Sequence, residues 1–315
     1  MYYIGVDVGG TSLKAGLVNE AGEIVARASC PTEPEKGVEH VVSRMAEVAR
    51  KAAEAAAVPL ADVHSIGLGI PGIEDPATHI VPICANLYWR DVPLAKMLTE
   101  ELNRPVYIGN DATVAGYAEY VAGISKGTDS SVFITLGTGV GGGIVINGKP
   151  WSGFHGVGSE IGHMMVEAGD GIVCTCENRG CWERYASATA LIRMGRVRAE
   201  KNPESALMQA VNGDADQITA KHVMDLAKAG DPDCAAAFEE YIYFLAAGIV
   251  NLINVLDPEM IILGGGVSHA GAFLLDAVRS KVDEMAFCKA LPHAKIELAR
   301  LGNDAGIIGA AMLGR

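Results

Sequence analysis

Aromatic residues and positive charge are both in short supply in this sequence. Phe, Trp and Tyr make up 6% of the 315 residues, which disfavours a stacking platform for single-stranded nucleic acid. The 25 Lys and Arg residues are outnumbered by 38 Asp and Glu residues, so the net charge is −13. We therefore expect no nucleic-acid partner, although a small pocket can still bind a phosphate group through backbone N–H groups.

Long apolar runs and an even set of cysteines are also missing. The most apolar stretch, residues 241–256, contains two asparagines and is shorter than the about 20 residues that a membrane span requires. It predicts a buried core helix and no membrane partner. The first residues lack the basic segment of a signal peptide, and seven cysteines do not suit a disulfide scaffold, so we expect a reducing, cytoplasmic location.

Apolar residues and glycine are plentiful. Half of the sequence is apolar, which allows a sizeable core, and 38 glycines indicate many turns and close approaches. Strands are expected at 2–8, 14–18, 23–30, 65–70, 106–108, 260–263 and 295–298, and helices at 37–57, 93–102, 111–121 and over most of the chain after residue 183. The alternation of strands and helices predicts an α/β fold.

One strand–glycine–strand pattern occurs twice. Aligning Gly9 with Gly137 also aligns Val18 with Ile146, so residues 131–146 repeat the pattern near the N-terminus. The repeat indicates a duplicated fold with two lobes. No low-complexity linker separates them.

The second glycine segment matches the G-x-G-x-x-G expression of dinucleotide-binding folds between Gly137 and Gly142. That interpretation requires a helix to begin at the loop, whereas residues 143–149 have the pattern of a strand and a hairpin turn. Two interpretations remain. The segment is a hairpin whose backbone N–H groups and Thr138 hydroxyl bind an anion, or it is an ordinary tight turn.

Three cysteines and a histidine are clustered in the middle of the sequence. His163, Cys174, Cys176 and Cys181 supply three thiolates and one imidazole, the ligand set of a closed, structural zinc site. The spacing differs from the usual C-x2-C pattern, and the alternative is a chance cluster of free cysteines.

Several polar residues are candidates for binding a hydroxylated ligand. Asn110 and Asp111 lie where an expected strand meets an expected helix, so they are either an N-cap or ligand-binding groups at the carboxyl end of a strand. Glu160, His163 and Glu183 flank the cysteine cluster. Taken singly, each is an ordinary surface residue; together they could bind sugar hydroxyls if the loop folds back.

Six motifs together resemble the ROK family (repressor, ORF, kinase) over essentially the whole chain, and are most similar to those of its bacterial ATP-dependent glucokinases. The motifs are DVGGT from Asp7, ND from Asn110, LGTG from Leu136, GSEIGH from Gly158, CTCENRGCWE from Cys174 and LGGG from Leu263. One residue departs from the family's pattern: Glu177 stands where the family commonly has glycine, although every expected ligand is retained.

The resemblance implies an actin-like (ribonuclease H-like) duplicated fold with two lobes around a cleft. We expect a small α/β lobe formed by residues 1–110 and 303–315, and a large lobe formed by residues 111–302. The large lobe would contain the zinc loop, residues 163–183. The family is often dimeric or tetrameric, so a homo-oligomer is expected.

The resemblance also implies a role for each matching residue. Asp111 is expected to be the general base and Asp7 to lie near the water shell of Mg²⁺. The expected phosphate hairpins consist of Asp7, Gly9, Gly10, Thr11, Gly137, Thr138 and Gly139, and the expected border of the adenosine of Gly264, Gly265 and Gly266. The expected sugar contacts are Gly72, Asn110, Asp111, Glu160, His163 and Glu183. The expected zinc ligands are His163, Cys174, Cys176 and Cys181.

The implied activity is phosphorylation of glucose at its 6-hydroxyl by ATP, with Mg²⁺ required and zinc in a structural role. Kinases for N-acetylmannosamine, N-acetylglucosamine, allose or fructose share the same carboxylates and remain alternatives. A sugar-responsive regulator is less expected, because family regulators carry an N-terminal helix-turn-helix module and this sequence starts in a strand. A filament or chaperone without a sugar site would leave the cysteine cluster unexplained.

Overall fold

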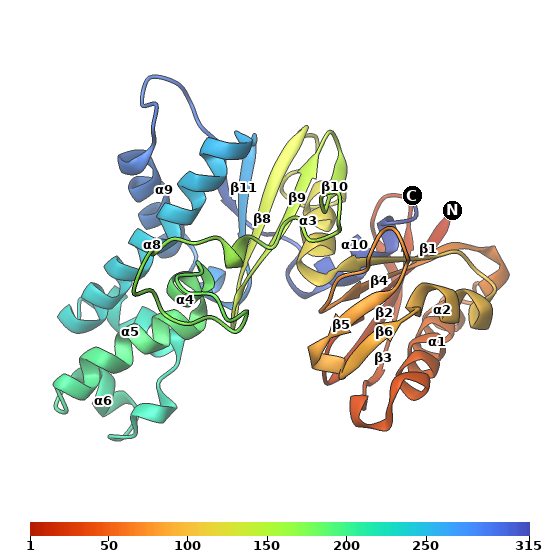
Figure 1. Cartoon of the computed structure of the whole chain (residues 1–315), viewed down its shortest axis with the longest axis horizontal. Helices are drawn as coiled ribbons and strands as arrows, with labels where there is room; N and C mark the ends of the chain where they lie inside the picture. The colour runs from red at the N-terminus through yellow and green to blue at the C-terminus, as the bar shows by residue number, and fades with distance from the viewer. The chain divides into compact units, whose positions relative to one another are not determined.

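The computed structural model describes all 315 residues, which form two compact units (Figure 1). The first unit consists of Met1–Phe133, Gly143–Ser159 and Ala299–Arg315, and the second of Ile134–Gly142 and Glu160–Leu298. The strands are β1 Tyr2–Val8, β2 Ser12–Asn19, β3 Ile24–Pro31, β4 Val63–Ile70, β5 Val81–Cys84, β6 Trp89–Val92, β7 Val106–Asn110, β8 Ser130–Leu136, β9 Val140–Ile146, β10 Lys149–Trp151, β11 Met260–Gly264 and β12 Lys295–Leu298.

The helices confirm the expected mixed α/β pattern. They are α1 Val38–Ala55, α2 Leu94–Leu102, α3 Asp111–Val121, α4 Glu183–Ala186, α5 Ala188–Lys201, α6 Ala206–Ala210, α7 Ala220–Lys228, α8 Pro232–Leu256, α9 Ala272–Met285 and α10 Ala305–Met312, with short 3₁₀ turns between several of them.

Two five-stranded sheets have the same strand order. The first is β3-β2-β1-β4-β7 and the second is β10-β9-β8-β11-β12. If the five strands of each sheet are numbered as they occur along the chain, both orders are third, second, first, fourth, fifth. In the first sheet, β1 pairs antiparallel with β2 and parallel with β4. The repeated topology confirms the duplication that the two glycine hairpins predicted.

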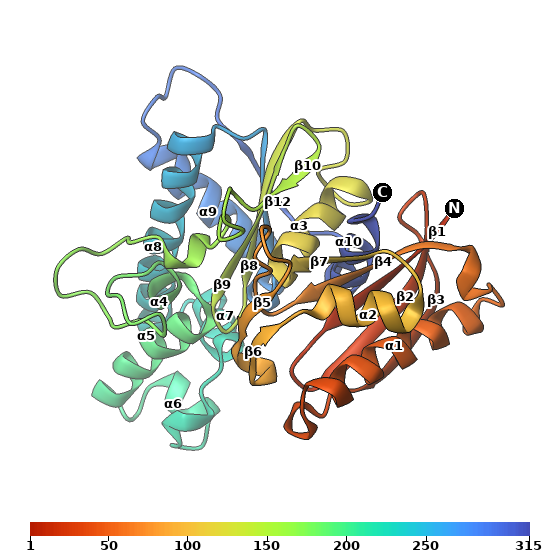
Figure 2. The same cartoon turned by 45° about the vertical axis from the view of Figure 1, so that its right-hand side comes forward.

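The first sheet is covered on both faces because its strands alternate between two apolar sides. Ile4 and Val6 of β1 lie in the core cluster that contains the buried side of α1. Tyr3 lies in a second cluster with α10. The intervening Gly5 makes this second face flat: a Cβ there would be 1.9 Å from the Ile307 carbonyl oxygen of α10. In Figure 2, α1 and α2 accordingly lie together, while α3 and α10 lie together elsewhere against the sheet.

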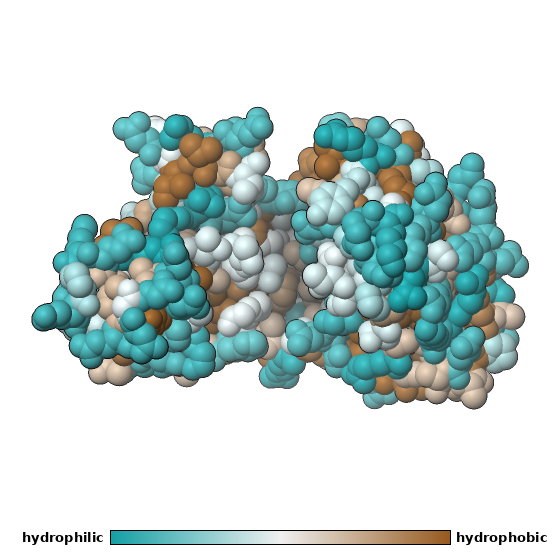
Figure 3. All heavy atoms as spheres, turned by 90° about the horizontal axis from the view of Figure 1, so that it is seen from below, coloured by the Kyte–Doolittle hydropathy of each residue, from teal (hydrophilic) through white to brown (hydrophobic).

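The second unit is built around α8, which contacts α4, α5, α7 and α9. By length and composition α8 is the one helix apolar enough to span a membrane, but 61% of its most apolar window is buried inside the protein. This burial agrees with the core helix predicted for residues 241–256. On the face drawn in Figure 3, hydrophilic side chains predominate and hydrophobic ones form small separate groups.

The division into two units differs from the lobes expected from the sequence over residues 111–133, 143–159 and 299–302, which belong to the first unit. We expected residues 111–302 to belong to the large lobe. The contacts of α3, however, assign this helix to the first unit. Its closest packing is against α10, and a Cβ at Gly309 would be 1.7 Å from the Val114 carbonyl oxygen. The expected lobes, residues 1–110 with 303–315 and residues 111–302, remain a prediction.

Candidate functional site

The first glycine hairpin joins β1 to β2 through Gly9, Gly10 and Thr11. The Gly9 N–H donates to the Ser12 carbonyl oxygen at 3.0 Å, which closes the turn. Thr32, the residue immediately after β3, supports the turn. Its hydroxyl donates to the Gly9 carbonyl oxygen at 2.7 Å, its N–H donates to the Thr11 carbonyl oxygen at 3.1 Å, and its side chain is fully buried.

Asp7 lies at the base of this hairpin on β1. Burial raises the pKa of its carboxyl group above the ordinary value, and the positive charge of Lys14 on the paired strand opposes that shift. Gly306 of α10 leaves room for it, because a Cβ there would be 2.9 Å from the Asp7 Cγ. A nearby cation would stabilise the ionised form of such a partly desolvated carboxylate.

Asn110 and Asp111 mark the junction of β7 and α3. The Asn110 side chain is the N-cap, since its Oδ1 accepts hydrogen bonds from the N–H groups of Ala112 and Thr113 at 3.0 and 3.3 Å. Its Nδ2 donates to the Gly72 carbonyl oxygen at 3.4 Å, which brings two predicted sugar contacts together. Asp111 is the first helical residue and is exposed, and its Oδ1 accepts from the Ala112 N–H at 2.7 Å. The N-cap interpretation therefore holds for Asn110, and the capping does not depend on Asp111 alone.

The second glycine hairpin joins β8 to β9 through Gly137, Thr138 and Gly139. The Gly137 N–H donates to the Gly139 carbonyl oxygen at 3.1 Å. The start of α5 supports this turn: the Ala188 N–H donates to the Gly137 carbonyl oxygen, and the Thr189 hydroxyl donates to the Thr138 carbonyl oxygen, both at 2.8 Å.

The glycine triplet after β11 lies beside the same hairpin. Gly265 has φ +79°, a left-handed conformation that favours glycine, and a Cβ there would be 2.6 Å from the Leu136 backbone. Gly264 ends β11 and Gly266 begins a 3₁₀ turn. The second unit therefore places two of the predicted nucleotide-binding segments next to each other.

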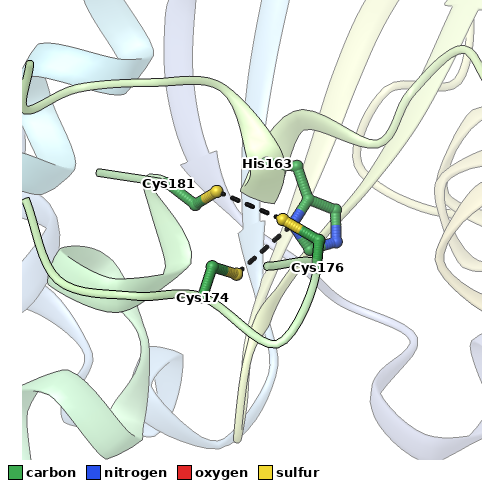
Figure 4. A group of neighbouring side chains, drawn as sticks. All are labelled: His163, Cys174, Cys176 and Cys181. Atoms are coloured by element: carbon green, nitrogen blue, oxygen red, sulfur yellow. Dashed lines mark hydrogen bonds between the residues drawn. The ribbon is translucent and has the colours of Figure 1, made fainter. Parts of the chain in front are cut away.

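His163, Cys174, Cys176 and Cys181 converge as expected for one metal ion (Figure 4). Their ligand atoms all lie within 4.8 Å of one another, with His163 Nδ1 at 3.6 Å from Cys174 Sγ and Cys176 Sγ at 3.5 Å from Cys181 Sγ. Ligand atoms around a tetrahedral zinc are roughly 3.3–3.8 Å apart, given bond lengths of about 2.0–2.3 Å. The four residues could therefore hold a metal ion of this kind.

The three thiols of the cluster differ in acidity. A backbone hydrogen bond from Asn178 lowers the pKa of Cys176 to about 7, whereas burial raises the pKa of Cys181 to about 12 and also raises that of Cys174. Buried neutral thiols become stable thiolates when a divalent cation is bound. The cluster is thus suited to a cation and poorly suited to three free thiolates.

The cluster is attached to the rest of the unit by Trp182. This side chain is fully buried, and its Nε1 donates to the Phe244 carbonyl oxygen at 2.8 Å. Its ring packs against Gly248, where the absence of a side chain makes room: a Cβ there would be 2.0 Å from the ring. Both Phe244 and Gly248 belong to α8. The core helix therefore fixes the end of the loop immediately before Glu183.

Glu160, His163 and Glu183 are brought together around the cluster. The pKa of Glu160 is raised by desolvation; the nearby His163 opposes this and the charge of Glu183 adds to it. The Nδ1 of His163 faces the sulfurs, and its Nε2 lies on the other side of the ring (Figure 4). Glu183 Oε1 accepts from Cys174 Sγ at 3.1 Å, and Glu183 Oε2 lies 2.5 Å from the place of a Cβ at Gly139. Glu183 therefore links the cysteine cluster to the second hairpin.

The family model of the ROK family matches residues 3–315, almost the entire chain. The chain belongs to the ROK family.

Individual ROK proteins are similar over nearly their full length. The glucokinase of Halalkalibacterium halodurans is 38% identical over 313 residues, which are 99% of this chain and 94% of that protein. The crystal structure of a ROK family glucokinase from Streptomyces griseus in complex with glucose and AMPPNP has a TM-score of 0.82 at 38% identity and covers 99% of both chains. The ROK hexokinase of Thermus thermophilus has a TM-score of 0.85 at 31% identity and covers 100% of this chain and 97% of that one. The predicted family and the actin-like two-lobe fold are both confirmed.

Sequence reasoning missed three threonines that form hydrogen bonds to the candidate site residues. Thr32 and Thr189 hold the two hairpins, and Thr175 contacts Glu183, its hydroxyl lying 3.4 Å from Glu183 Oε1. Only Thr175 had a local signal, its place between two predicted metal ligands. The departure at Glu177 does have a structural consequence: this residue adopts φ +70°, a conformation that glycine takes without steric cost.

Proposed function

We propose that this chain is a glucokinase, which transfers the γ-phosphoryl group of ATP to the 6-hydroxyl of glucose. The supporting observation is the likeness, over nearly the full length, to the Streptomyces griseus glucokinase with glucose and AMPPNP. The chemistry of the residues in each unit also supports it: the glycine hairpins suit a phosphorylated donor, and the exposed carboxylates and histidine suit a hydroxylated acceptor. An acidic protein can bind ATP in this way because backbone amides supply the positive ends of dipoles without basic side chains.

In the proposed reaction Asp111 accepts the proton of the sugar 6-hydroxyl as the new phosphorus–oxygen bond forms and the bond to the ADP oxygen breaks. Phosphoryl transfer needs positioning and neutralisation of the phosphate oxygens more than covalent help. The two hairpins (Gly9 to Thr11 and Gly137 to Gly139) would bind phosphates, and Gly264 to Gly266 would border the adenosine. Asp7 would hold the water shell of Mg²⁺, which supplies charge neutralisation when bound.

The sugar hydroxyls would be held by Asn110, Gly72, Glu160, His163 and Glu183, in addition to Asp111. His163 would act through both ring nitrogens. With Nδ1 as a zinc ligand, the ring would carry its proton on Nε2, and Nε2 would donate to a sugar hydroxyl. Zinc would be structural, because four protein ligands leave no open position for water.

A coupled assay of ADP formation over a panel of hexoses tests the proposal. Glucose should have the highest kcat/KM among glucose, N-acetylmannosamine, N-acetylglucosamine, allose and fructose. A kcat/KM at least ten times that of glucose for another sugar, about 1.4 kcal/mol, would assign that sugar instead. No hexose-dependent ADP formation would reject the kinase and favour the sugar-responsive regulator.

Two further expectations belong to the same proposal. We infer a homo-oligomer, dimer or tetramer, which sedimentation equilibrium measures directly. We also infer that the protein acts in the cytoplasm, where ATP and a reducing environment for the three cysteines are both present.

A further inference from the structure

The carboxylate of Glu183 lies between the metal loop and the second hairpin. Oε1 lies 3.1 Å from Cys174 Sγ and 3.4 Å from the Thr175 hydroxyl, and both donate to it. Oε2 occupies the space left free at Gly139, where a Cβ would be 2.5 Å away. The hydrogen bonds that orient Glu183 are therefore those at Oε1, while Oε2 lies beside Gly139.

These two donors are not equivalent once the cluster holds a metal ion. Cys174 is one of the four ligands, and a ligating cysteine is a thiolate, which has no proton to donate. Thr175 is not a ligand and keeps its hydroxyl proton. Thr175 also lies between Cys174 and Cys176, so metal binding at its two neighbours restrains its backbone.

We propose that Thr175 is a positioning residue, whose hydroxyl holds Glu183 in the orientation that binds sugar while the metal ion is bound. The inference rests on the proposed role of Glu183 as a sugar contact. It extends that role by assigning the donor that orients the carboxylate, and it gives the residue between the first two cysteines a function separate from metal binding. Gly139 completes the arrangement, because it gives Oε2 room beside the second hairpin.

The test uses the zinc-loaded protein with Thr175→Val, which removes the hydroxyl with little change of shape, and Thr175→Ser, which keeps it. Calorimetric titration with glucose in the absence of nucleotide should show a dissociation constant raised about three- to tenfold for Thr175→Val, the loss expected for one hydrogen bond to a carboxylate. Thr175→Ser should bind glucose within about twofold of the wild type. Zinc content should stay at one ion per chain, and KM for ATP should not change in either variant.

A double-mutant cycle with Glu183→Gln makes the test specific. If Thr175 acts through Glu183, Thr175→Val should weaken glucose binding much less in the Glu183→Gln background than in the wild type. Equal effects in both backgrounds overturn the inference, as does a Thr175→Val protein that retains zinc and binds glucose like the wild type. Loss of zinc from Thr175→Val also overturns it, because the residue would then act through the metal.

The failure of the underlying function gives a different result. If Glu183→Gln itself binds glucose like the wild type, the assignment of Glu183 as a sugar contact fails, and the role of Thr175 fails with it. If Glu183→Gln weakens binding at least tenfold while Thr175→Val has no effect, the proposed function stands and only the role of Thr175 is rejected.

Discussion

The two glycine hairpins share a strand–glycine–strand pattern but have different supports. The first is held by Thr32, which immediately follows β3 of the same sheet and is fully buried. The second is held by the start of α5, through the Ala188 N–H and the exposed Thr189 hydroxyl. The strand pattern was thus retained in both halves, while the contacts that fix each turn come from different kinds of element.

The same contrast extends to the residues proposed to bind sugar. In the first unit, Asn110 and Asp111 lie at the start of α3, and their backbone is set by a strand and a capped helix. In the second unit, Glu160 and His163 lie at a short 3₁₀ turn in a long segment without other regular structure. Besides its own backbone bridges, that segment has the cysteine cluster and Trp182 as attachments. We therefore expect proton transfer at Asp111 not to depend on the metal, and the sugar contacts of the second unit to depend on it.

The largest expected effect comes from Asp111→Asn. The variant keeps the shape of the side chain but removes its basicity, so kcat should fall about 10²- to 10⁴-fold, while KM for ATP changes little because the hairpins are untouched. Thermal stability should be retained, since Asn110 provides the cap. A folded variant with more than about a tenth of the wild-type kcat would show that Asp111 is not the base.

The second-largest expected effect comes from removing the metal ion, which should act on the second unit and not on the first. Replacing both Cys174 and Cys176 by serine should release zinc and lower glucose affinity by about ten- to a hundredfold, because the ordering of Glu160, His163 and Glu183 is lost. The matched control is Cys288→Ser, a cysteine outside the cluster, which should keep both zinc and affinity. Elemental analysis that finds no zinc in wild-type protein purified without chelator would remove the metal from the account.

The supports of the hairpins should differ in their contribution to stability. Thr32→Val breaks a hydrogen bond in a fully buried position and should lower the free energy of unfolding by about 1–3 kcal/mol. Thr189→Val breaks a bond of similar length at an exposed position, so its loss should be about 0.5 kcal/mol or less. Urea denaturation of the two variants measures both values. Equal losses would mean that the two supports contribute alike.

The smallest expected effect is at Glu177 in the metal loop. Glu177→Gly should stabilise the protein by about 0.5–1 kcal/mol, because φ +70° is costly for a residue with a Cβ and free of that cost for glycine. Glu239→Gly, at an exposed position within α8, provides a control of opposite sign and should cost about 1 kcal/mol. If urea denaturation shows that Glu177→Gly destabilises the protein, the side chain of Glu177 makes a contribution that outweighs its backbone strain.

Local patterns predicted much of the fold and the clustering of some site residues. The two hairpins, α1, α3 and β11 follow from alternation, glycine turns and capping residues, all of which act within a few positions. The cysteine cluster was predicted for the same reason, since its ligand types are recognisable and three of them lie close together in the sequence. The β5–β6 pair was not predicted, because each strand has only four residues, too few for a periodic signal, and β5 also contains a proline.

Contacts between distant residues could not be predicted from local patterns. Trp182 donates to the backbone of Phe244, 62 residues later, and α3 packs against α10 near the other end of the chain. The bond from Thr32 to Gly9 likewise depends on the pairing of β2 with β3. Such partners are determined by tertiary packing, which is why the supports of the site were missed while many of its loops were recognised.

The most direct test of the account is to identify the product of the wild-type protein with ATP, Mg²⁺ and glucose by ³¹P NMR. We predict one ADP formed for each glucose 6-phosphate, with no phosphate ester at another hydroxyl. Formation of inorganic phosphate without a sugar phosphate, or of an ester at a position other than the 6-hydroxyl, would contradict it.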